Sequence, residues 1–436
     1  MPETITVRML YGREGMELKV PPSTTILEGQ DPPAVSNPQA AVIEALSRPI
    51  GSAPLPELLA QKKPQTVAIT ISDKTRPVPN KQFLPAMLDV LNAAGIGDSQ
   101  IVIIIGTGMH KPSTDTERVL LVGREILKRI EVVDHRADDP QTLVKVSDDP
   151  PISISRRFIE ADFRIVTGFI EPHFLAGFSG GRKGVCPALV DLETIRDFHG
   201  YDTLRNPATD GGNLEGNPCH EIAMKVAKTV GVDFLFNVAI TRDSQIADIY
   251  CGDLEEAHLA GCKQVADWTT AYIDETFDLV ITNGGGFPLD QTFYQTVKGM
   301  RVALPSLAKT STLLQVSDCG ERLGSNAYTD MMLHYDNNWR RFMADIKSNR
   351  GETRLDQWQY QTQSRILSHI GQEKLWFVSD GIPAEMQNHI SVTPILGPGN
   401  AQQRAQQAID KYLAANPHAR VAAIPQGPYT MLRRMG

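Results

Sequence analysis

The sequence has few cysteines, no long hydrophobic run and no excess of positive charge, and each absence excludes a class of protein. The five cysteines among 436 residues are odd in number and form no C-x-x-C pair. They predict buried thiols in a reduced compartment rather than a disulfide framework. The longest apolar runs, such as residues 101–105, have the length of a strand and not of a membrane helix. The first residues, MPETITVRML, contain no basic or apolar leader segment, so we expect a cytoplasmic protein.

The charge balance also narrows the range of partners. A net charge of −8 disfavours non-specific binding to nucleic acid, and no segment predicts a membrane anchor. The chain lacks the G-x-G-x-x-G motif of dinucleotide-binding proteins, the Gly-Lys-Ser/Thr of P-loops and the H-x-x-x-H pattern of zinc sites. The local basic spots therefore indicate a small anionic ligand rather than a nucleic acid.

Apolar runs of strand length alternate with helical segments along nearly the whole chain. Continuous Val and Ile runs between helices are typical of a mostly parallel sheet covered on both faces. The pattern restarts after residue 268, which predicts two α/β domains, 1–268 and 269–436, with an active site in the cleft between them. Helices at 253–268 and 402–414 are the predicted hinges. Other predicted elements are a hairpin around 11–15, strands at 67–71, 101–105, 163–167, 233–240, 277–282, 311–316, 375–378 and 391–395, and helices at 81–94, 115–130, 191–199, 290–304, 326–346 and 356–369.

Polar clusters follow four of the predicted strands, at the carboxyl ends where open α/β sheets bind ligands. Their recurrence at one edge of the sheet is stronger evidence for a site than any single motif. The clusters are residues 72–77 (SDKTRP), 106–112 (GTGMHKP), 171–184 (EPHFLAGFSGGRKG) and 283–286 (NGGG), the last leading to 294–298 (YQTVK).

The SGGRKG turn in the third cluster combines glycines with two adjacent cations. Backbone N–H groups of Ser179, Gly180 and Gly181, together with Arg182 and Lys183, form a pattern that binds phosphate. A flexible turn with solvated cations is the alternative interpretation. Lys183 also suits a nucleophile or covalent anchor, because burial and the neighbouring Arg182 would depress its pKa.

Three histidines have positions that indicate chemistry. His110 and His173 follow different strands and suit a racemisation, in which one imidazole takes a proton and the other delivers a proton on the mirror face. Each alone is more often structural, but two at one sheet edge favour the catalytic interpretation. His199 ends the predicted helix 191–199, where the helix dipole alone would favour it; as a metal ligand it would need further ligands from a cofactor.

Two further pairs have the charge and spacing to bind an acid. Asp73 and Arg76 bracket a turn, and Arg76 suits a carboxylate or phosphate through its guanidinium fork. A local Asp73–Arg76 ion pair is the alternative. Gln295 and Lys298 lie three residues apart on one helix face, where they either face solvent or contact an acidic substrate.

These segments together resemble the nickel-pincer lactate racemase family of 2-hydroxyacid racemases and epimerases. The resemblance is carried by residues 72–77, 108–110, 171–184, 198–199 and 294–298, and it agrees with the domain pattern over nearly the whole chain. It implies inversion of C2 of a 2-hydroxy acid by hydride transfer through a transient 2-keto acid. Lactate, malate, a longer aliphatic acid, an aromatic acid and a sugar acid all stay open as substrates. The implied cofactor is a nickel-pincer nucleotide, a nickel complex of a dithio-modified pyridinium mononucleotide, which maturation enzymes would supply as transient partners.

The resemblance also implies roles for individual residues. Lys183 would carry the cofactor through a thioamide, His199 would bind its nickel, and His110 and His173 would be the acid/base pair. A conventional dehydrogenase and a small-acid binding protein are the alternatives. The missing G-x-G-x-x-G disfavours the first, and the second leaves the paired histidines without a purpose. Implied cofactor-binding residues are Asp73, Lys74, Thr75, Arg76, Ser179, Gly180 and Gly181, and implied substrate-binding residues are Tyr294, Gln295, Lys298 and Trp358.

Overall fold

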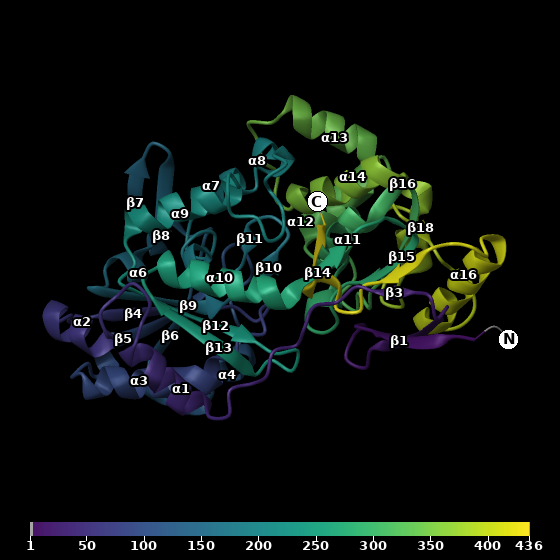
Figure 1. The fold of residues 1–436 in the computed structure, drawn as a ribbon. Coiled ribbons are helices and arrows are strands. Elements are labelled where there is room, and N and C mark those ends of the chain that lie inside the picture. Colours follow the sequence, from purple (N-terminus) through teal and green to yellow (C-terminus); the bar gives the residue numbers. More distant parts are fainter. Residues whose placement is uncertain (1–2, 436) are drawn as a thin grey trace. The chain divides into compact units, whose positions relative to one another are not determined.

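The computed structural model describes residues 3–435, which form two compact α/β units with mostly parallel sheets (Figure 1). The N-terminal unit comprises Asp31–His199 and Asn206–Trp268. The C-terminal unit comprises the described residues up to Gln30, the short segment Gly200–Arg205, and the chain from Thr269 onward. The fold class therefore agrees with the sequence prediction.

The N-terminal unit is built on a six-stranded sheet. Its first five strands are parallel, and the edge strand β13 runs antiparallel to β12. Nearly every residue of β4 and β5 is buried, which explains why these strands are continuous apolar runs. In the sheet order β6-β5-β4-β9-β12-β13, the strands are β6 (Glu131–Asp134), β5 (Ile101–Gly106), β4 (Val67–Ser72), β9 (Phe163–Phe169), β12 (Phe234–Ile240) and β13 (Ile246–Gly252).

Helices cover both faces of this sheet. In Figure 1, α1 and α3 lie on one side of the sheet, and α9 and α10 lie on the other. Val42, Phe83 and Ile69 belong to the same buried core, so α1 and α3 bury their apolar faces against the strands. The helices are α1 (Pro38–Ser47), α2 (Leu55–Lys62), α3 (Asn80–Ala93), α4 (Asp115–Val122), α5 (Arg124–Arg129), α6 (Arg156–Ile159), α7 (Leu192–Phe198), α9 (Pro218–Val230) and α10 (Glu256–Thr269). Two small hairpins pair β7 (Leu143–Asp148) with β8 (Pro151–Ser155) and β10 (Pro172–His173) with β11 (Gly177–Phe178).

The C-terminal unit has its own six-stranded parallel sheet with a core on each face. One core contains α11 to α14, and the other contains α16 and the hairpin of β1 and β2. The sheet order is β18 (Thr393–Pro394), β17 (Leu375–Val378), β16 (Leu307–Val316), β15 (Phe277–Asn283), β19 (Val421–Ala423) and β3 (Thr25–Ile26). The remaining elements are β1 (Ile5–Met9), β2 (Met16–Val20), β14 (Thr270–Ile273), β20 (Met431–Arg434), α8 (Tyr201–Arg205), α11 (Phe293–Ala303), α12 (Asn326–Tyr335), α13 (Trp339–Ser348), α14 (Gln357–Ile370), α15 (Ala384–Gln387) and α16 (Ala401–Ala415).

The beginning of the chain lies in the C-terminal unit, although the sequence placed it in the domain 1–268. The predicted hairpin around residues 11–15 forms from β1 and β2, and its apolar side packs on the C-terminal sheet. Strand β3 then adds to the edge of that sheet by pairing with β19. Periodicity identifies the hairpin but not β3, and it does not reveal which distant sheet these strands join. The hinge role predicted for the helices observed as α10 and α16 stays a prediction.

Two helices predicted as continuous are broken, and the predicted strand 391–395 is shorter. Gly123, with φ +86°, separates α4 from α5, and Asp336 and Asn337, both with positive φ, separate α12 from α13. A left-handed residue ends the helical hydrogen-bond ladder. Strand β18 contains only Thr393 and Pro394, because Ser391, with φ +55°, leaves the extended conformation before the strand begins.

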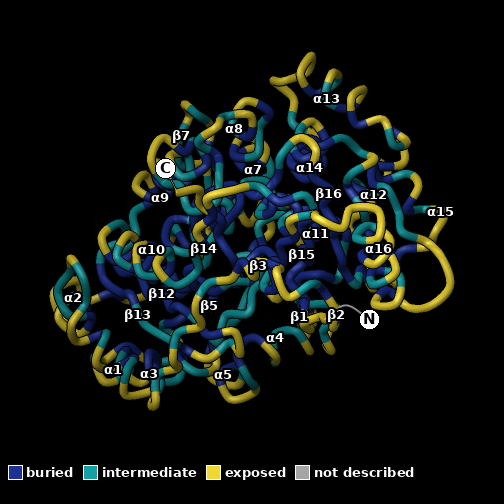
Figure 2. Tube along the Cα trace, turned by 45° about the vertical axis from the view of Figure 1, so that its right-hand side comes forward, coloured by how far each residue is buried: buried dark blue, intermediate teal, exposed yellow. Residues whose placement is uncertain are grey.

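Burial follows the layers of each unit. Figure 2 shows exposed residues concentrated on helices such as α2, α13 and α16, while the strands of the two large sheets are mostly buried. All five cysteines are buried and none forms a disulfide, as the sequence predicts. Among the described residues, no helix combines the length and apolar character needed to cross a membrane.

Candidate active site

The N-terminal sheet reverses its strand order between β4 and β9. The chain proceeds from β4 through β5 to β6 in one direction, and from β9 through β12 to β13 in the other. Ligands of open α/β sheets bind outside the carboxyl ends of the strands at such a switch point. The loop after β4 carries Asp73, the loop after β9 carries His173, and β5, beside β4, leads to His110. The fold thus gathers the predicted residues of this unit where a ligand is expected.

Asp73 holds His110. The Nδ1 atom of His110 lies 2.7 Å from Oδ2 of Asp73, whose other oxygen accepts a hydrogen bond of 2.6 Å from the Thr75 hydroxyl. Burial alone would raise the pKa of Asp73, but the charge and hydrogen bond of His110 and the bond from Thr75 lower it to about 2. The carboxylate is therefore ionised and directs a proton to Nδ1 of His110, which leaves Nε2 for proton exchange.

His173 is held differently, by backbone groups. Its Nδ1 atom accepts hydrogen bonds from the backbone N–H groups of Leu175 (3.2 Å) and Ala176 (3.1 Å). A nitrogen that accepts carries no proton, so the neutral ring has its proton on Nε2. That Nε2 atom lies 3.2 Å from Nζ of Lys183.

The amine of Lys183 occupies a setting that favours its neutral form. Burial, followed by the positive charges of Arg76 and Arg182, lowers its pKa to about 7. A lysine with this pKa has a large neutral fraction at physiological pH and is a competent nucleophile. This environment fits the anchor role that the sequence assigns to Lys183.

The glycines of the SGGRKG turn are required by contacts within the protein. A Cβ on Gly180 would lie 2.5 Å from Oδ1 of Asn237, and a Cβ on Gly181 would lie 2.5 Å from the ring of His258. The backbone N–H of Gly181 donates to Asn237 Oδ1 (2.7 Å), and that of Ser179 donates to a backbone carbonyl (2.9 Å). These two N–H groups stabilise the turn itself, so phosphate binding by Ser179, Gly180 and Gly181 stays a prediction.

Arg182 does not lie at the surface as a solvated cation. Its side chain is fully buried and donates to the carbonyl oxygens of Ala176 (2.5 Å), Phe178 (2.9 Å) and Gly180 (3.3 Å). Burial lowers its pKa to about 10. Arg182 therefore ties together the loop that carries both His173 and Lys183.

The remaining residues of the 72–77 cluster have separate partners. Arg76 lies 3.9 Å from Glu171, a loose ion pair, and Lys74 forms a closer one, 2.6 Å, with Glu117 of α4. The ion-pair partner of Asp73 is His110, so the local Asp73–Arg76 pair considered as an alternative is not the main contact. Thr75 supports Asp73 directly.

His199 follows α7 with its Nδ1 atom 2.8 Å from the carbonyl oxygen of Ile195. The ring donates through Nδ1, so the lone pair is on Nε2, the arrangement found in metal-binding histidines. Burial and then the charge of Lys183 lower the pKa of His199 to about 3, which keeps it neutral. Among the described residues, no group of three or more His, Cys, Asp and Glu side chains is placed to hold a metal.

The predicted substrate-binding residues lie together in the C-terminal unit. Helix α11 carries Tyr294, Gln295 and Lys298, and α14 carries Trp358. The indole N–H of Trp358 donates to the Tyr294 hydroxyl (2.6 Å), and the Gln359 amide donates to the Tyr294 carbonyl (2.5 Å). The aromatic pair thus fixes the first turn of α11.

Sequence reasoning missed two residues that hold the SGGRKG turn in place through contacts from other elements. Asn237 and His258 are buried and contact the turn from β12 and α10, and His258 was among the histidines given no role. No motif marks either residue, because each acts through a contact with a distant segment.

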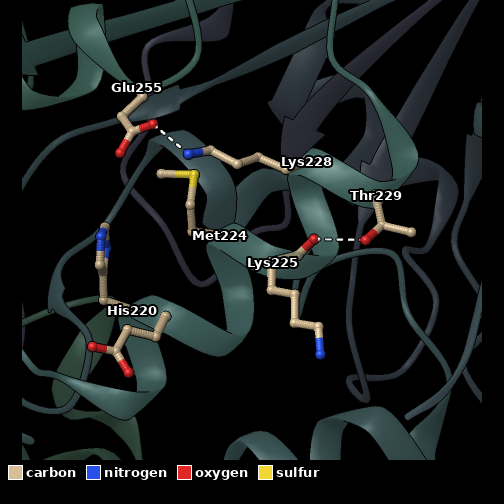
Figure 3. Close-up of a pocket in the computed structure, with 7 residues that line it drawn as sticks. His220, Met224, Lys225, Lys228, Thr229 and Glu255 are labelled. Carbon is tan, nitrogen blue, oxygen red and sulfur yellow. Dashed lines mark hydrogen bonds and ion pairs between the residues drawn. The ribbon is translucent and has the colours of Figure 1, made fainter. Parts of the chain in front are cut away.

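A surface pocket of about 630 Å³ lies elsewhere, beside α9 and α10, and contains none of the predicted residues (Figure 3). Figure 3 shows the ion pair between Lys228 and Glu255 at this pocket. The Nζ atom of Lys228 lies 2.6 Å from Oε2 of Glu255.

Comparison with known proteins then identifies the family. Residues 11–212 match the lactate racemase N-terminal domain, and residues 273–431 match the lactate racemase C-terminal domain. The chain belongs to the lactate racemase family. It is 33% identical over 392 residues to the lactate racemase of Lactiplantibacillus plantarum, covering 89% of both chains. It is 31% identical over 395 residues to that of Thermoanaerobacterium thermosaccharolyticum, covering 90% of both.

Solved structures agree with this assignment to the lactate racemase family. The structure of the lactate racemase apoprotein from Thermoanaerobacterium thermosaccharolyticum superposes with a TM-score of 0.88 at 28% identity, over 98% of this chain and 100% of that chain. A protein from Thermotoga maritima shares the fold, with a TM-score of 0.69 at 16% identity over 93% of this chain and 100% of that one. As a member of the lactate racemase family, the chain is an isomerase of the racemase type.

Proposed function

We propose that the protein interconverts the enantiomers of a small 2-hydroxy acid, with lactate as the first candidate. The observation that carries the proposal is the pair of histidines at the switch point, His110 held by Asp73 and His173 held by two backbone N–H groups. The 33% identity to a lactate racemase supports lactate over the other acids. Malate, a longer aliphatic acid, an aromatic acid and a sugar acid are the alternatives that the same site chemistry accommodates.

The proton chemistry follows from the protonation of the two rings. The C2–H of a hydroxy acid is too weakly acidic for an imidazole to remove, whereas its hydroxyl proton lies within the range of a histidine when C2 loses hydride at the same time. One histidine takes the hydroxyl proton through Nε2 as the planar 2-keto acid forms. The second histidine returns a proton when hydride comes back to the opposite face. Nε2 of His110 is the acceptor and Nε2–H of His173 is the donor in this arrangement, so the two rings meet the substrate in complementary states.

The residues present fit the nickel-pincer nucleotide that the family resemblance implies. Lys183 provides a buried amine of lowered pKa for covalent attachment, and His199 provides a neutral Nε2 for nickel, the other nickel ligands coming from the cofactor. The 73–76 loop and the SGGRKG turn lie at the carboxyl ends of β4 and β9, where a phosphate is expected. When bound, this cofactor supplies a reversible hydride acceptor. Gln295 and Lys298 are proposed to bind the substrate carboxylate, with Tyr294 and Trp358 shaping that end of the site.

The test uses protein produced together with the cofactor-maturation enzymes. The nickel-loaded protein is incubated with L-lactate and, separately, with D-lactate, and chiral chromatography follows both enantiomers. We expect both reactions to end at equal amounts of the two enantiomers, without consumption of free NAD. Interconversion of another 2-hydroxy acid but not lactate would correct the substrate. Absence of interconversion with every acid tested would overturn the proposed function, and net release of keto acid would favour a dehydrogenase.

A further inference from the structure

The hydrogen-bond directions around His173 determine the charge of Lys183. Leu175 and Ala176 both donate backbone N–H groups to Nδ1 of His173, so Nδ1 has no proton. The neutral ring must then have its proton on Nε2, the atom 3.2 Å from Nζ of Lys183. Because Nε2–H is a donor, Nζ must accept with its lone pair. Only the uncharged amine has a lone pair, so the contact requires a neutral lysine.

The opposite arrangement is unfavourable. An ammonium at Lys183 would donate to Nε2 and move the ring proton to Nδ1, where it would face two backbone N–H groups. His173 is buried, so solvent cannot compensate those two unsatisfied donors. The neighbouring positive charges of Arg76 and Arg182 act in the same direction, because they disfavour a further charge on Lys183.

We propose that Lys183 masks the Nε2–H group of His173 in the unloaded protein, and that acylation of Lys183 releases this N–H donor to a ligand. The proposal rests on the proposed function, in which Lys183 is the attachment point and His173 an acid/base group. It adds that attachment changes the hydrogen-bonding state of a catalytic histidine. The protein would thereby gain an available Nε2–H donor at His173 only when its covalent group is in place.

The chemistry of acylation explains the release. The Lys183 nitrogen forms a bond to the acyl carbon of an activated carboxyl or thiocarboxyl compound, the bond from that carbon to its leaving group breaks, and one amine proton departs with the leaving group. In the resulting amide or thioamide, the nitrogen lone pair is delocalised and no longer accepts hydrogen bonds. Nε2–H of His173 then no longer has Lys183 as an acceptor and can donate to a ligand.

The experiment uses the full chain without cofactor, so it does not depend on racemase activity. Histidines are labelled with 15N, and ring chemical shifts report the tautomer of His173, which His173→Gln assigns. We expect wild type to show a bare Nδ1 and a protonated Nε2 whose proton exchanges slowly with water. Acetyllysine introduced at position 183 should leave Nδ1 unchanged and accelerate exchange of the Nε2 proton roughly tenfold, the loss expected for one hydrogen bond.

Two controls keep the result specific. Lys183→Met removes the nitrogen at similar length and should reproduce the faster exchange, while His135, whose Nε2 donates to the carbonyl of Val190 (2.9 Å), should stay unchanged in every variant. A proton on Nδ1 of His173 in wild type, or an unaltered Nε2 exchange rate with acetyllysine, would overturn the proposal. A shift of the His135 signals would identify unfolding instead, and the Lys183→Met variant would then decide. Loaded protein that fails to racemise any acid would overturn the proposed function and leave this tautomer result intact.

Discussion

The carboxylate of Asp73 lies 2.7 Å from Nδ1 of His110, and this contact distinguishes the two site histidines. His110 has an ionised partner, whereas Nδ1 of His173 accepts two backbone N–H groups. A carboxylate stabilises the protonated imidazole, and two backbone donors stabilise the neutral one. The two rings therefore differ in tautomer, because Nδ1 of His110 donates to a carboxylate whereas Nδ1 of His173 carries no proton.

Asp73→Asn should reduce racemisation while preserving the fold. The amide keeps the shape of the side chain but loses the charge that stabilises the protonated ring of His110. Because general acid–base catalysis contributes about 10²- to 10⁴-fold, we expect kcat to fall on the order of 10²-fold in both directions. Initial rates from each enantiomer on nickel-loaded protein, with circular dichroism for the fold, provide the measurement.

The chain contains a matched control for this substitution. His389 and Asp336 form a second Nδ1–carboxylate pair at 2.6 Å, but it is exposed in the C-terminal unit. Asp336→Asn should leave kcat unchanged. Equal losses in the two variants, or full activity in Asp73→Asn, would show that the Asp73 carboxylate has no special part in catalysis.

Arg182→Met should destabilise the N-terminal unit. The substitution keeps the length of the side chain but leaves the carbonyl groups of Ala176 and Phe178 without their donors in a buried setting. Charge-assisted hydrogen bonds contribute about 1.5–3 kcal/mol each, and relief of a buried charge offsets part of the loss, so we expect about 2–4 kcal/mol. Urea unfolding measures the change. Arg48→Met, in an ion pair whose arginine side chain is 80% exposed, should change stability by less than about 0.5 kcal/mol.

Gly181→Ala should lower the free energy of unfolding more than Gly216→Ala does. The difference between the two variants measures the cost of packing at the turn, apart from the cost of backbone strain. Gly181 has φ +53°, and its new Cβ would lie 2.5 Å from the His258 ring. Gly216 has a similar φ of +62° with no atom within 4 Å of a Cβ. Left-handed strain costs about 1–2 kcal/mol in both alanine variants, and overpacking adds about 1–3 kcal/mol at Gly181 alone. Equal unfolding free energies for the two variants would show that the His258 contact does not constrain the turn.

Much of the fold was predictable from the sequence, because buried parallel strands are continuous apolar runs. The breaks at Gly123 and Asp336–Asn337 were missed, since helical periodicity continues across them and only the backbone angles reveal the change of direction. The assignment of residues 3–30 to the C-terminal unit depends on pairing between β3 and β19, which are separated by nearly the whole chain. Local pattern contains no information on such distant pairing.

The site was predictable where a reactive side chain closely follows the carboxyl end of a predicted strand, as at His110, His173 and Lys183. It was not predictable where a side chain acts through packing. Arg182 was expected to meet an anion, but it is buried and binds backbone carbonyls. Asn237 and His258 contact the turn from other elements, so no spacing along the chain could identify them.

His135→Gln should make the protein less sensitive to acid. His135 is buried, and burial lowers its pKa from the ordinary value of 6.5 to about 4. Below pH 6.5 the unfolded chain binds a proton at this position and the folded chain does not, so folding stability is lost as the pH falls from 6.5 towards 4. One pKa unit corresponds to about 1.4 kcal/mol, so this histidine should account for a loss on the order of 2–3 kcal/mol.

Glutamine retains an N–H that can donate to the Val190 carbonyl but does not titrate. Urea unfolding at pH 7 and pH 4.5 should therefore show a smaller difference for His135→Gln than for wild type. His418→Gln, at an exposed position, should keep the wild-type difference. An unchanged pH dependence in His135→Gln would contradict this prediction. Protonation of the imidazole is the only property of residue 135 that changes over this pH range, so other groups would then cause the acid sensitivity.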